Sequence, residues 1–156
     1  MSNPDSNKIA IPEGYVLHGQ PGGFVHRNGP VFIKYTDAGS SLMMTLGAEH
    51  TNASGFAAGG LLMMLIDIAL GTHVSANVGT RAICPTVQLN CNLVSGARVG
   101  ETLIGESEIS RLTRSLAFAS GHLRVGDRKV VTATAVFHIP PDIAAARKPS
   151  SQPTQS

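Results

Sequence analysis

The chain has 156 residues, a formal net charge of +2 and a charged fraction of only 14%. This length makes one domain that can bury a core. The charged fraction is well below the roughly 25% of soluble domains, so we expect copies of the chain to cover part of its surface. With no basic block and only 4% aromatic residues, the composition argues against nucleic-acid binding.

Polar segments begin and end the chain. Residues 1–10 and 141–156 hold too few apolar residues to build a core, so we expect a flexible N-terminal tail, one domain at 11–140 and a disordered C-terminal tail. No run reaches the roughly 18 apolar residues of a membrane span, and the first residues lack the pattern of a signal peptide. Two cysteines without disulfide or metal spacing suit a reducing compartment. We therefore expect a cytoplasmic protein that does not bind membranes.

The first half of the domain leads into one long helix. Residues 13–30 are rich in Gly and Pro and predict an irregular segment with a short helical turn. Strand patterns follow at 31–35 and 41–47. Residues 60–77, "GLLMMLIDIALGTHVSAN", lack Pro and are too long for a strand, which predicts a helix. Its first half is apolar on every side, so other structure must surround it.

Strand patterns fill the rest of the domain. Residues 82–94 alternate, with Val87, Leu89, Cys91 and Leu93 on one side and Thr86, Gln88, Asn90 and Asn92 on the other. Further strands are expected at 101–112, 115–125 and 129–139, the last two joined by a hairpin turn at "VGDRK". The order predicts an α+β fold in which an antiparallel sheet of five to six strands wraps around one central helix.

Asp67 is the only carboxylate between His50 and Gly71. A carboxylate in an apolar helix costs several kcal/mol to desolvate unless it has partners. It is either satisfied by local partners at a structural junction, or it is a general base or nucleophile at the edge of a cleft. Gly59 and Gly60, at the start of the same helix, also have two interpretations. Their free N–H groups could polarise a carbonyl, or the pair could only let the helix end pack closely.

The stretches "HTNASGFAAGG" and "PTVQLNCNLVSGARVGE", with Asp67 between them, resemble the PaaI-like branch of the hotdog-fold acyl-CoA thioesterases over about His26 to Ile139. The positions that match the family pattern are Asn52, Gly55, Gly59, Gly60 and Asp67, with Thr86 as the Ser or Thr of the following strand. The resemblance implies a hotdog fold that hydrolyses an acyl-CoA thioester to coenzyme A and a free acid. No separate cofactor is expected, because coenzyme A is part of the substrate.

The resemblance also implies roles for single residues. Asp67, Gly59, Asn52 and Thr86 would be catalytic, and the site would lie at the subunit interface of a homodimer or homotetramer. Thr86 would hold the attacking water or the carboxylate, although Thr is also simply a good strand former. Asn52 would orient water or the thioester, or would only form an Asx turn.

Ala58 departs from the family, whose members often carry a histidine there. This departure keeps open the alternative of a non-catalytic hotdog protein that binds acyl-CoA. A hotdog enoyl-CoA hydratase is a less favoured alternative, because nothing in this sequence matches the loop motif of that family. The expected substrate-binding residues are Gly60, Ala58, His50, Arg111 and Arg114.

His50 would support the neighbouring loop. Arg111 and Arg114, expected to cluster with Arg124, could contact the phosphates of coenzyme A or form a solvated hairpin face. The six histidines show no ligand spacing, so no metal site is expected.

Overall fold

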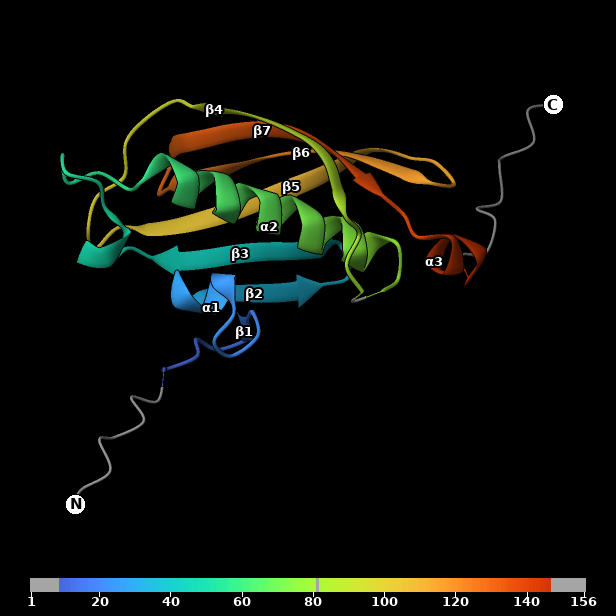
Figure 1. The fold of residues 1–156 in the computed structure, drawn as a ribbon, viewed down its shortest axis with the longest axis horizontal. Coiled ribbons are helices and arrows are strands. Elements are labelled where there is room, and N and C mark those ends of the chain that lie inside the picture. Colours follow the sequence, from blue (N-terminus) through green and yellow to red (C-terminus); the bar gives the residue numbers. More distant parts are fainter. Residues whose placement is uncertain (1–8, 81, 147–156) are drawn as a thin grey trace, which may run out of the picture.

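A computed structural model describes residues 9–80 and 82–146. Of the expected tails at 1–10 and 141–156, residues 1–8 and 147–156 lie outside this described part. One antiparallel sheet of seven strands forms the body of the fold (Figure 1), in the order β1-β2-β3-β5-β6-β7-β4. The strands are β1 (Val16–His18), β2 (Val31–Thr36), β3 (Gly39–Thr45), β4 (Thr86–Leu93), β5 (Thr102–Leu112), β6 (Leu116–Val125) and β7 (Arg128–His138). This arrangement confirms the predicted α+β class.

The long helix α2 (Gly59–Asn77) packs against the sheet, as its sequence predicts. Leu65, Ile66 and Leu70 have no solvent exposure and form the centre of the core. By length and composition α2 could cross a membrane, and 44% of its apolar window is buried inside the described chain. The helix contacts strands β3, β4, β5, β6 and β7, as a core helix does. The apolar run is therefore explained by packing on the sheet.

Gly105 lets α2 lie close to the middle of the sheet. A Cβ atom at this position of β5 would come within 2.9 Å of the Ala69 Cβ and 3.1 Å of the Leu42 Cβ. These contacts are shorter than packed side chains tolerate, so a larger residue would push the helix away from the strand. The close approach fixes the height of the helix above the sheet and therefore the position of Asp67.

Four short elements complete the described chain. The irregular segment before β2 holds β1 and the short helix α1 (Phe24–Arg27), and a single 3-10 turn spans Ala48–His50. Because β1 pairs with β2, the sheet has seven strands rather than the predicted five to six. The expected C-terminal tail begins with a short helix, α3 (Pro141–Ala146). Ile143 of α3 is buried against the core, which supplies the apolar contact that holds this turn in place.

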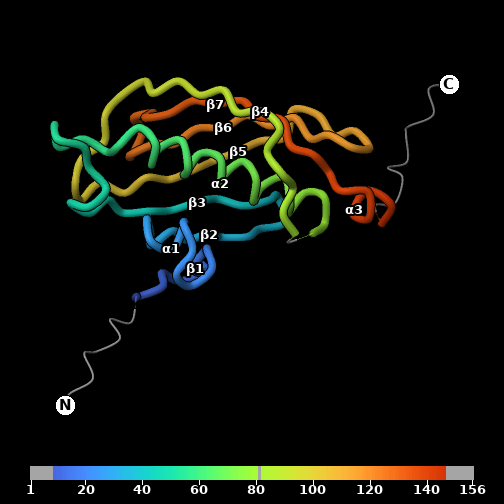
Figure 2. The backbone as a smooth tube through the Cα atoms, viewed as in Figure 1, coloured from blue at the N-terminus to red at the C-terminus, as the bar shows by residue number. Residues whose placement is uncertain are grey.

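The sheet curves around α2, so its two edge strands lie on opposite sides of the helix. Figure 2 shows β4 passing along one side of α2 while β1 and β2 lie along the other. β4 pairs only with β7, which leaves its outer edge open within the described chain. Val87 and Leu93 on this edge strand are 61% and 48% exposed. An open edge with exposed apolar side chains is a surface that proteins normally cover.

Candidate active site

Asp67 and Thr86 form a direct pair between helix and edge strand. The Thr86 hydroxyl donates a hydrogen bond to Asp67 Oδ1 over 2.8 Å. Asp67 is half-buried and Thr86 is exposed, so the pair lies at the surface of the fold rather than inside it. A carboxylate held in this way keeps its second oxygen available for a water molecule or a substrate.

A β-bulge turns the Thr86 side chain toward α2. Strict alternation predicts that Thr86 shares the outer face with Gln88, but the register shifts between these two residues. Thr86 therefore lies opposite Phe137 on the face toward α2, while Gln88 lies opposite Val136. The predicted polar-face position of Thr86 is wrong, because the extra residue of a bulge turns the chain before it.

The Asp67–Thr86 pair borders a cleft of about 240 Å³. The walls come from α2, both edge strands and the segment before β4. The lining residues are His18, Tyr35, Asp67, Ile68, Gly71, Thr72, Ser75, Ala82, Ile83, Cys84, Thr86 and Phe137. Most of this surface is apolar, so the cleft can hold an organic group next to a carboxylate. Sequence reasoning missed His18, because a three-residue strand in a Gly-rich and Pro-rich segment gives no periodic signal.

Cys84 is the thiol of this cleft. Its side chain is 4% exposed, and burial raises the pKa of the Cys84 thiol, with a hydrogen bond to Ser75 acting in the opposite direction. A thiol with a raised pKa stays protonated near neutral pH and is a weak nucleophile. Cys84 is therefore a poor candidate nucleophile, and Asp67 supplies the carboxylate of the cleft.

The start of α2 borders a second, smaller cleft of about 140 Å³. Its lining includes three predicted substrate-binding residues, Ala58, Gly60 and His50, together with Phe24, Asn28, Glu49, Leu61 and Met64. The first backbone bond of the helix runs from the Leu62 N–H to the Ala58 carbonyl. The N–H groups of Gly59 and Gly60 precede it and have no acceptor within the described residues, which is the arrangement that attracts negative charge.

His50 connects the loop that leads into α2 to a neighbouring loop. Its Nδ1 accepts the Gly47 N–H over 2.8 Å, and its Nε2 lies 3.3 Å from the Gly29 carbonyl. The His50 carbonyl accepts the Ala58 N–H over 2.9 Å. Both ring nitrogens are thus used to join two loops, and the ring is 5% exposed. His50 therefore supports the loop and also lines the small cleft.

Asn52 forms an Asx turn, the structural alternative raised by the sequence. Its Oδ1 accepts the Ser54 N–H over 2.9 Å and the Phe56 N–H over 3.3 Å. The side-chain oxygen is consequently committed to the loop. The catalytic role that the resemblance implies for Asn52 would therefore have to use the Nδ2 amino group of the side chain as a donor.

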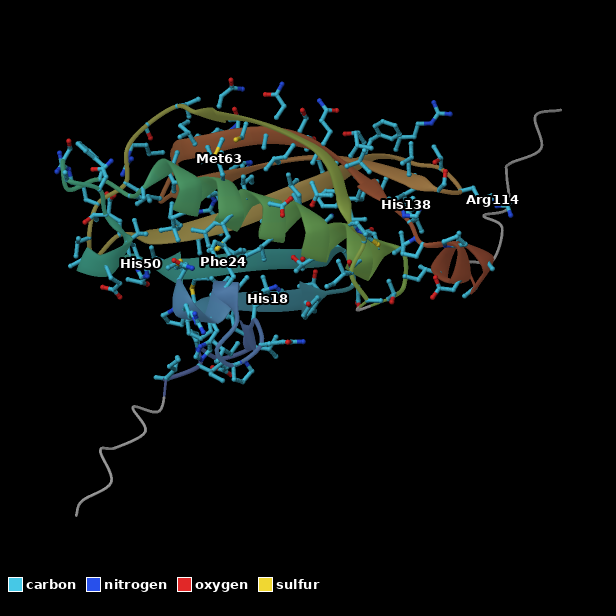
Figure 3. All side chains as sticks on the ribbon, viewed as in Figure 1. His18, Phe24, His50, Met63, Arg114 and His138 are labelled. Atoms are coloured by element: carbon cyan, nitrogen blue, oxygen red, sulfur yellow. The ribbon has the colours of Figure 1, made fainter. Side chains whose placement is uncertain are left out.

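The three arginines do not cluster as predicted. Arg111 and Arg114 are exposed at the end of β5 and in the turn that follows it. Arg124 pairs with Ile104 near the other end of the same hairpin and donates to Glu106 Oε1 over 2.7 Å. The guanidinium of Arg124 lowers the pKa of the Glu106 carboxyl. Figure 3 shows Arg114 and His138 at the end of the molecule opposite His50.

Within one chain the two halves of the predicted site are apart. Gly59 and Asp67 are eight residues apart on α2, which is about 12 Å along a helix. The structure brings Asp67 to Thr86, and it brings Gly60, Ala58 and His50 to a separate cleft. A single thioester carbonyl cannot contact both places in one subunit.

Comparisons with known proteins agree with this fold. The model of the thioesterase superfamily matches residues 54–132. A Pseudomonas aeruginosa protein named "Putative esterase PA0474" is 33% identical over 132 residues, which is 83% of this chain and 98% of that protein.

Two solved structures share the architecture. The phenylacetic acid degradation protein PaaI of Thermus thermophilus has a TM-score of 0.67 and 16% identity, over 75% of this chain and 98% of that one. A Streptococcus pneumoniae thioesterase protein solved with coenzyme A has a TM-score of 0.62 and 22% identity, over 69% of this chain and 86% of that one. The chain therefore belongs to the thioesterase superfamily and has the hotdog fold of its PaaI-like members.

Proposed function

We propose that this chain is an acyl-CoA thioesterase that releases coenzyme A and a free carboxylic acid. The observation that carries the proposal is the hydrogen-bonded Asp67–Thr86 pair at an apolar cleft. A carboxylate beside an apolar cleft suits hydrolysis of an acyl group. The coenzyme A in the Streptococcus pneumoniae protein and the esterase name of the Pseudomonas aeruginosa relative support this substrate class.

Asp67 can act by two routes. As a general base, it takes a proton from water while the water oxygen bonds to the acyl carbon; the C–S bond then breaks and the thiolate of coenzyme A takes up a proton. As a nucleophile, its oxygen bonds to the acyl carbon and expels the thiolate, and water then opens the mixed anhydride. In both routes the Thr86 hydroxyl holds the carboxylate in place.

The second half of the site would come from a partner subunit. Thr86 begins β4, and Leu93 ends it. A Cβ at Gly59 would lie 3.2 Å from Leu93 Cδ1, so the helix start lies next to the far end of the strand. If two β4 edges pair antiparallel in the register that places the two copies of Asn90 opposite each other, Thr86 of one chain lies opposite Leu93 of the other. Asp67 of one subunit and the Gly59 and Gly60 amides of its partner would then meet at one carbonyl.

Exposed side chains favour this assembly. Met63 on α2 is 47% exposed and Val94 after β4 is 54% exposed. A symmetric pair of edge strands would cover such a surface and give a homodimer, or a homotetramer through a further interface. Arg111 and Arg114 would lie at the end of the sheet where β4 begins and could bind the phosphates of coenzyme A. We also propose a cytoplasmic location, which suits the two free thiols.

Release of free thiol from a panel of acyl-CoAs tests the activity. We expect Asp67→Asn to keep the fold and the oligomer and to lower turnover at least about a hundredfold, the low end for loss of a positioned acid or base. Asp37→Asn, in an exposed turn between β2 and β3, is the matched control and should leave turnover unchanged. Turnover of Asp67→Asn within about threefold of the parent would show that Asp67 is structural.

Mixing two inactive variants tests the shared site. Gly60→Glu places a negative charge at the helix start, where an added Cβ meets nothing within 4 Å. A dimer of Asp67→Asn with Gly60→Glu would contain one doubly defective site and one intact site. After subunit exchange, we expect about a quarter of the parent activity. Failure of the mixture to exceed its components, or a monomer by light scattering, would contradict a site built from two subunits.

Ala58 favours one other candidate, a hotdog protein that binds acyl-CoA without hydrolysing it. The helix start lacks the imidazole that many relatives carry, while both clefts remain. Calorimetric binding of acyl-CoAs without thiol release would establish this alternative. Thiol release that depends on Asp67 would exclude it.

A further inference from the structure

The cleft next to Asp67 is lined by residues from both edges of the sheet. β1 and β4 are the two outermost strands, yet His18 of β1 and Thr86 of β4 line the same cleft. His18 pairs with Val31, which has no solvent exposure on the helix-facing side of β2. Curvature of the sheet around α2 therefore places an imidazole and the Asp67–Thr86 pair in the same cleft, from opposite edges of the sheet.

Three polar side chains of the cleft already have partners. The Thr72 hydroxyl donates to the Ile68 carbonyl over 2.8 Å, and the Ser75 hydroxyl donates to the Ala82 carbonyl over 3.0 Å. The Thr86 hydroxyl donates to Asp67 over 2.8 Å. These three hydroxyl groups donate their hydrogen bonds within the chain, so they are not available as donors to a ligand.

His18 differs from them. Within residues 9–80 and 82–146, neither ring nitrogen of His18 forms a hydrogen bond or ion pair. The ring is half-buried, and this burial lowers the pKa of His18. A neutral imidazole carries one N–H donor and one nitrogen acceptor. His18 therefore presents both kinds of hydrogen-bonding atom to whatever fills the cleft.

The contents of the cleft decide whether these atoms are satisfied. In the open cleft, water can bind the imidazole. A hydrocarbon acyl group that displaces this water leaves the ring without a partner, which is unfavourable for a partly buried polar group. An acyl group that carries an oxygen substituent restores the hydrogen bond. A cavity of about 150 Å³ accepts benzene, so a cleft of about 240 Å³ has room for a compact acyl group with such a substituent.

We propose that His18 is the residue that selects the acyl group, by hydrogen bonding to an oxygen that the acyl group carries beyond the thioester carbonyl. This inference rests on the proposed thioesterase function. It assigns substrate recognition to β1, an element far in sequence from Asp67 and Thr86. His18 contacts the acyl group and leaves the hydrolytic step to Asp67.

Matched pairs of substrates test the assignment in the full-length protein. The pairs are cyclohexanecarbonyl-CoA with trans-4-hydroxycyclohexanecarbonyl-CoA, and phenylpropionyl-CoA with para-hydroxyphenylpropionyl-CoA. We expect the parent to prefer the hydroxylated member of at least one pair about tenfold in kcat/KM, the size of one hydrogen bond. His18→Phe keeps a ring of similar size and should reduce this preference to about one, mainly by raising KM, with kcat within about threefold. His18→Gln should restore part of the preference.

Controls separate the possible failures. His26→Phe, an exposed histidine of α1 outside the cleft, should leave the preference unchanged. Thiol release by the parent without preference in either pair, or equal loss on both members in His18→Phe, would overturn the role of His18 while the thioesterase proposal stands. Absence of thiol release from every substrate would overturn both.

A second measurement does not depend on the folding of a His18 variant. In Asp67→Asn, which should bind acyl-CoAs without hydrolysing them, the imidazole ¹⁵N resonances of His18 can be followed by NMR. We expect the hydroxylated member of the preferred pair to shift them and the hydrocarbon member to shift them less. Equal shifts with both members would overturn the inference.

Discussion

Removal of the Thr86 hydroxyl should weaken catalysis without unfolding the protein. Thr86→Val keeps the branched shape and deletes the 2.8 Å hydrogen bond to Asp67. A hydrogen bond to a charged group contributes roughly 1.5 to 3 kcal/mol. Thr86 is exposed, so water replaces part of the lost interaction. We expect a loss of about 1.4 kcal/mol in transition-state stabilisation, which is about tenfold in kcat/KM.

A double-mutant cycle checks that the loss comes from the carboxylate. Because Thr86 acts through Asp67, Thr86→Val should lower kcat/KM by less than about threefold when Asp67 is already Asn. Thr134→Val, on the outer face of β7, is the matched control and should leave kcat/KM unchanged. The reasoning would be refuted by a full tenfold loss in the Asp67→Asn background, or by an equal loss in the control.

Two further predictions address the helix start and the outer face of the sheet. Ala58→His fills the small cleft beside Gly60. It should change kcat/KM for acyl-CoAs at least about threefold, up or down, and leave the oligomeric state of the parent unchanged. Ala53→His, in the exposed loop, should leave kcat/KM unchanged. Unchanged turnover and binding would show that residue 58 does not line the site. Arg124 holds the pKa of Glu106 below its ordinary value of 4.5, so Glu106→Gln should lower the free energy of unfolding by about 0.5 kcal/mol at neutral pH. Since the folded state has the lower pKa, this difference should be complete above about pH 4.5 and fade as the pH falls through the folded value. Urea unfolding across this range measures it, and a difference that does not change with pH would contradict the ion pair.

Periodicity predicts the body of the fold because it reports burial directly. The run from Gly60 to Asn77 is long, apolar and free of proline, and it forms α2 nearly residue for residue. The alternating segments become long strands for the same reason. The three-residue strand β1 and the helix α3 could not be predicted, because β1 contributes no fully buried side chain and α3 contributes only Ile143. Such elements are ordered by tertiary contacts, which a local pattern does not contain.

The site depends on features that alternation cannot report. The pattern places Thr86 with Gln88, and only the bulge between them turns Thr86 toward α2. Bulges have no fixed residue signature, so the resemblance found the position of Thr86 while the periodicity placed it on the wrong face. Arg124 was misplaced for a related reason. Arg114 lies in the turn of the β5–β6 hairpin, whereas Arg124 pairs with Ile104 near the other end of the hairpin. The two arginines are therefore close in sequence but far apart in space.

The bulge would also let one strand contribute to two sites in the proposed dimer. Thr86 lies opposite Phe137 and Leu93 lies opposite Val131, so both ends of β4 face α2. The two positions are seven apart in sequence number, and in a regular strand an odd difference would place them on opposite faces. The extra residue of the bulge removes this mismatch. In an antiparallel pair of β4 edges, the Thr86 end of each strand could then meet the Leu93 end of its partner on the same side of the sheet. The two symmetric sites that we propose would therefore depend on the bulge between Thr86 and Gln88. Removal of the extra residue would turn Thr86 away from Asp67 in both sites.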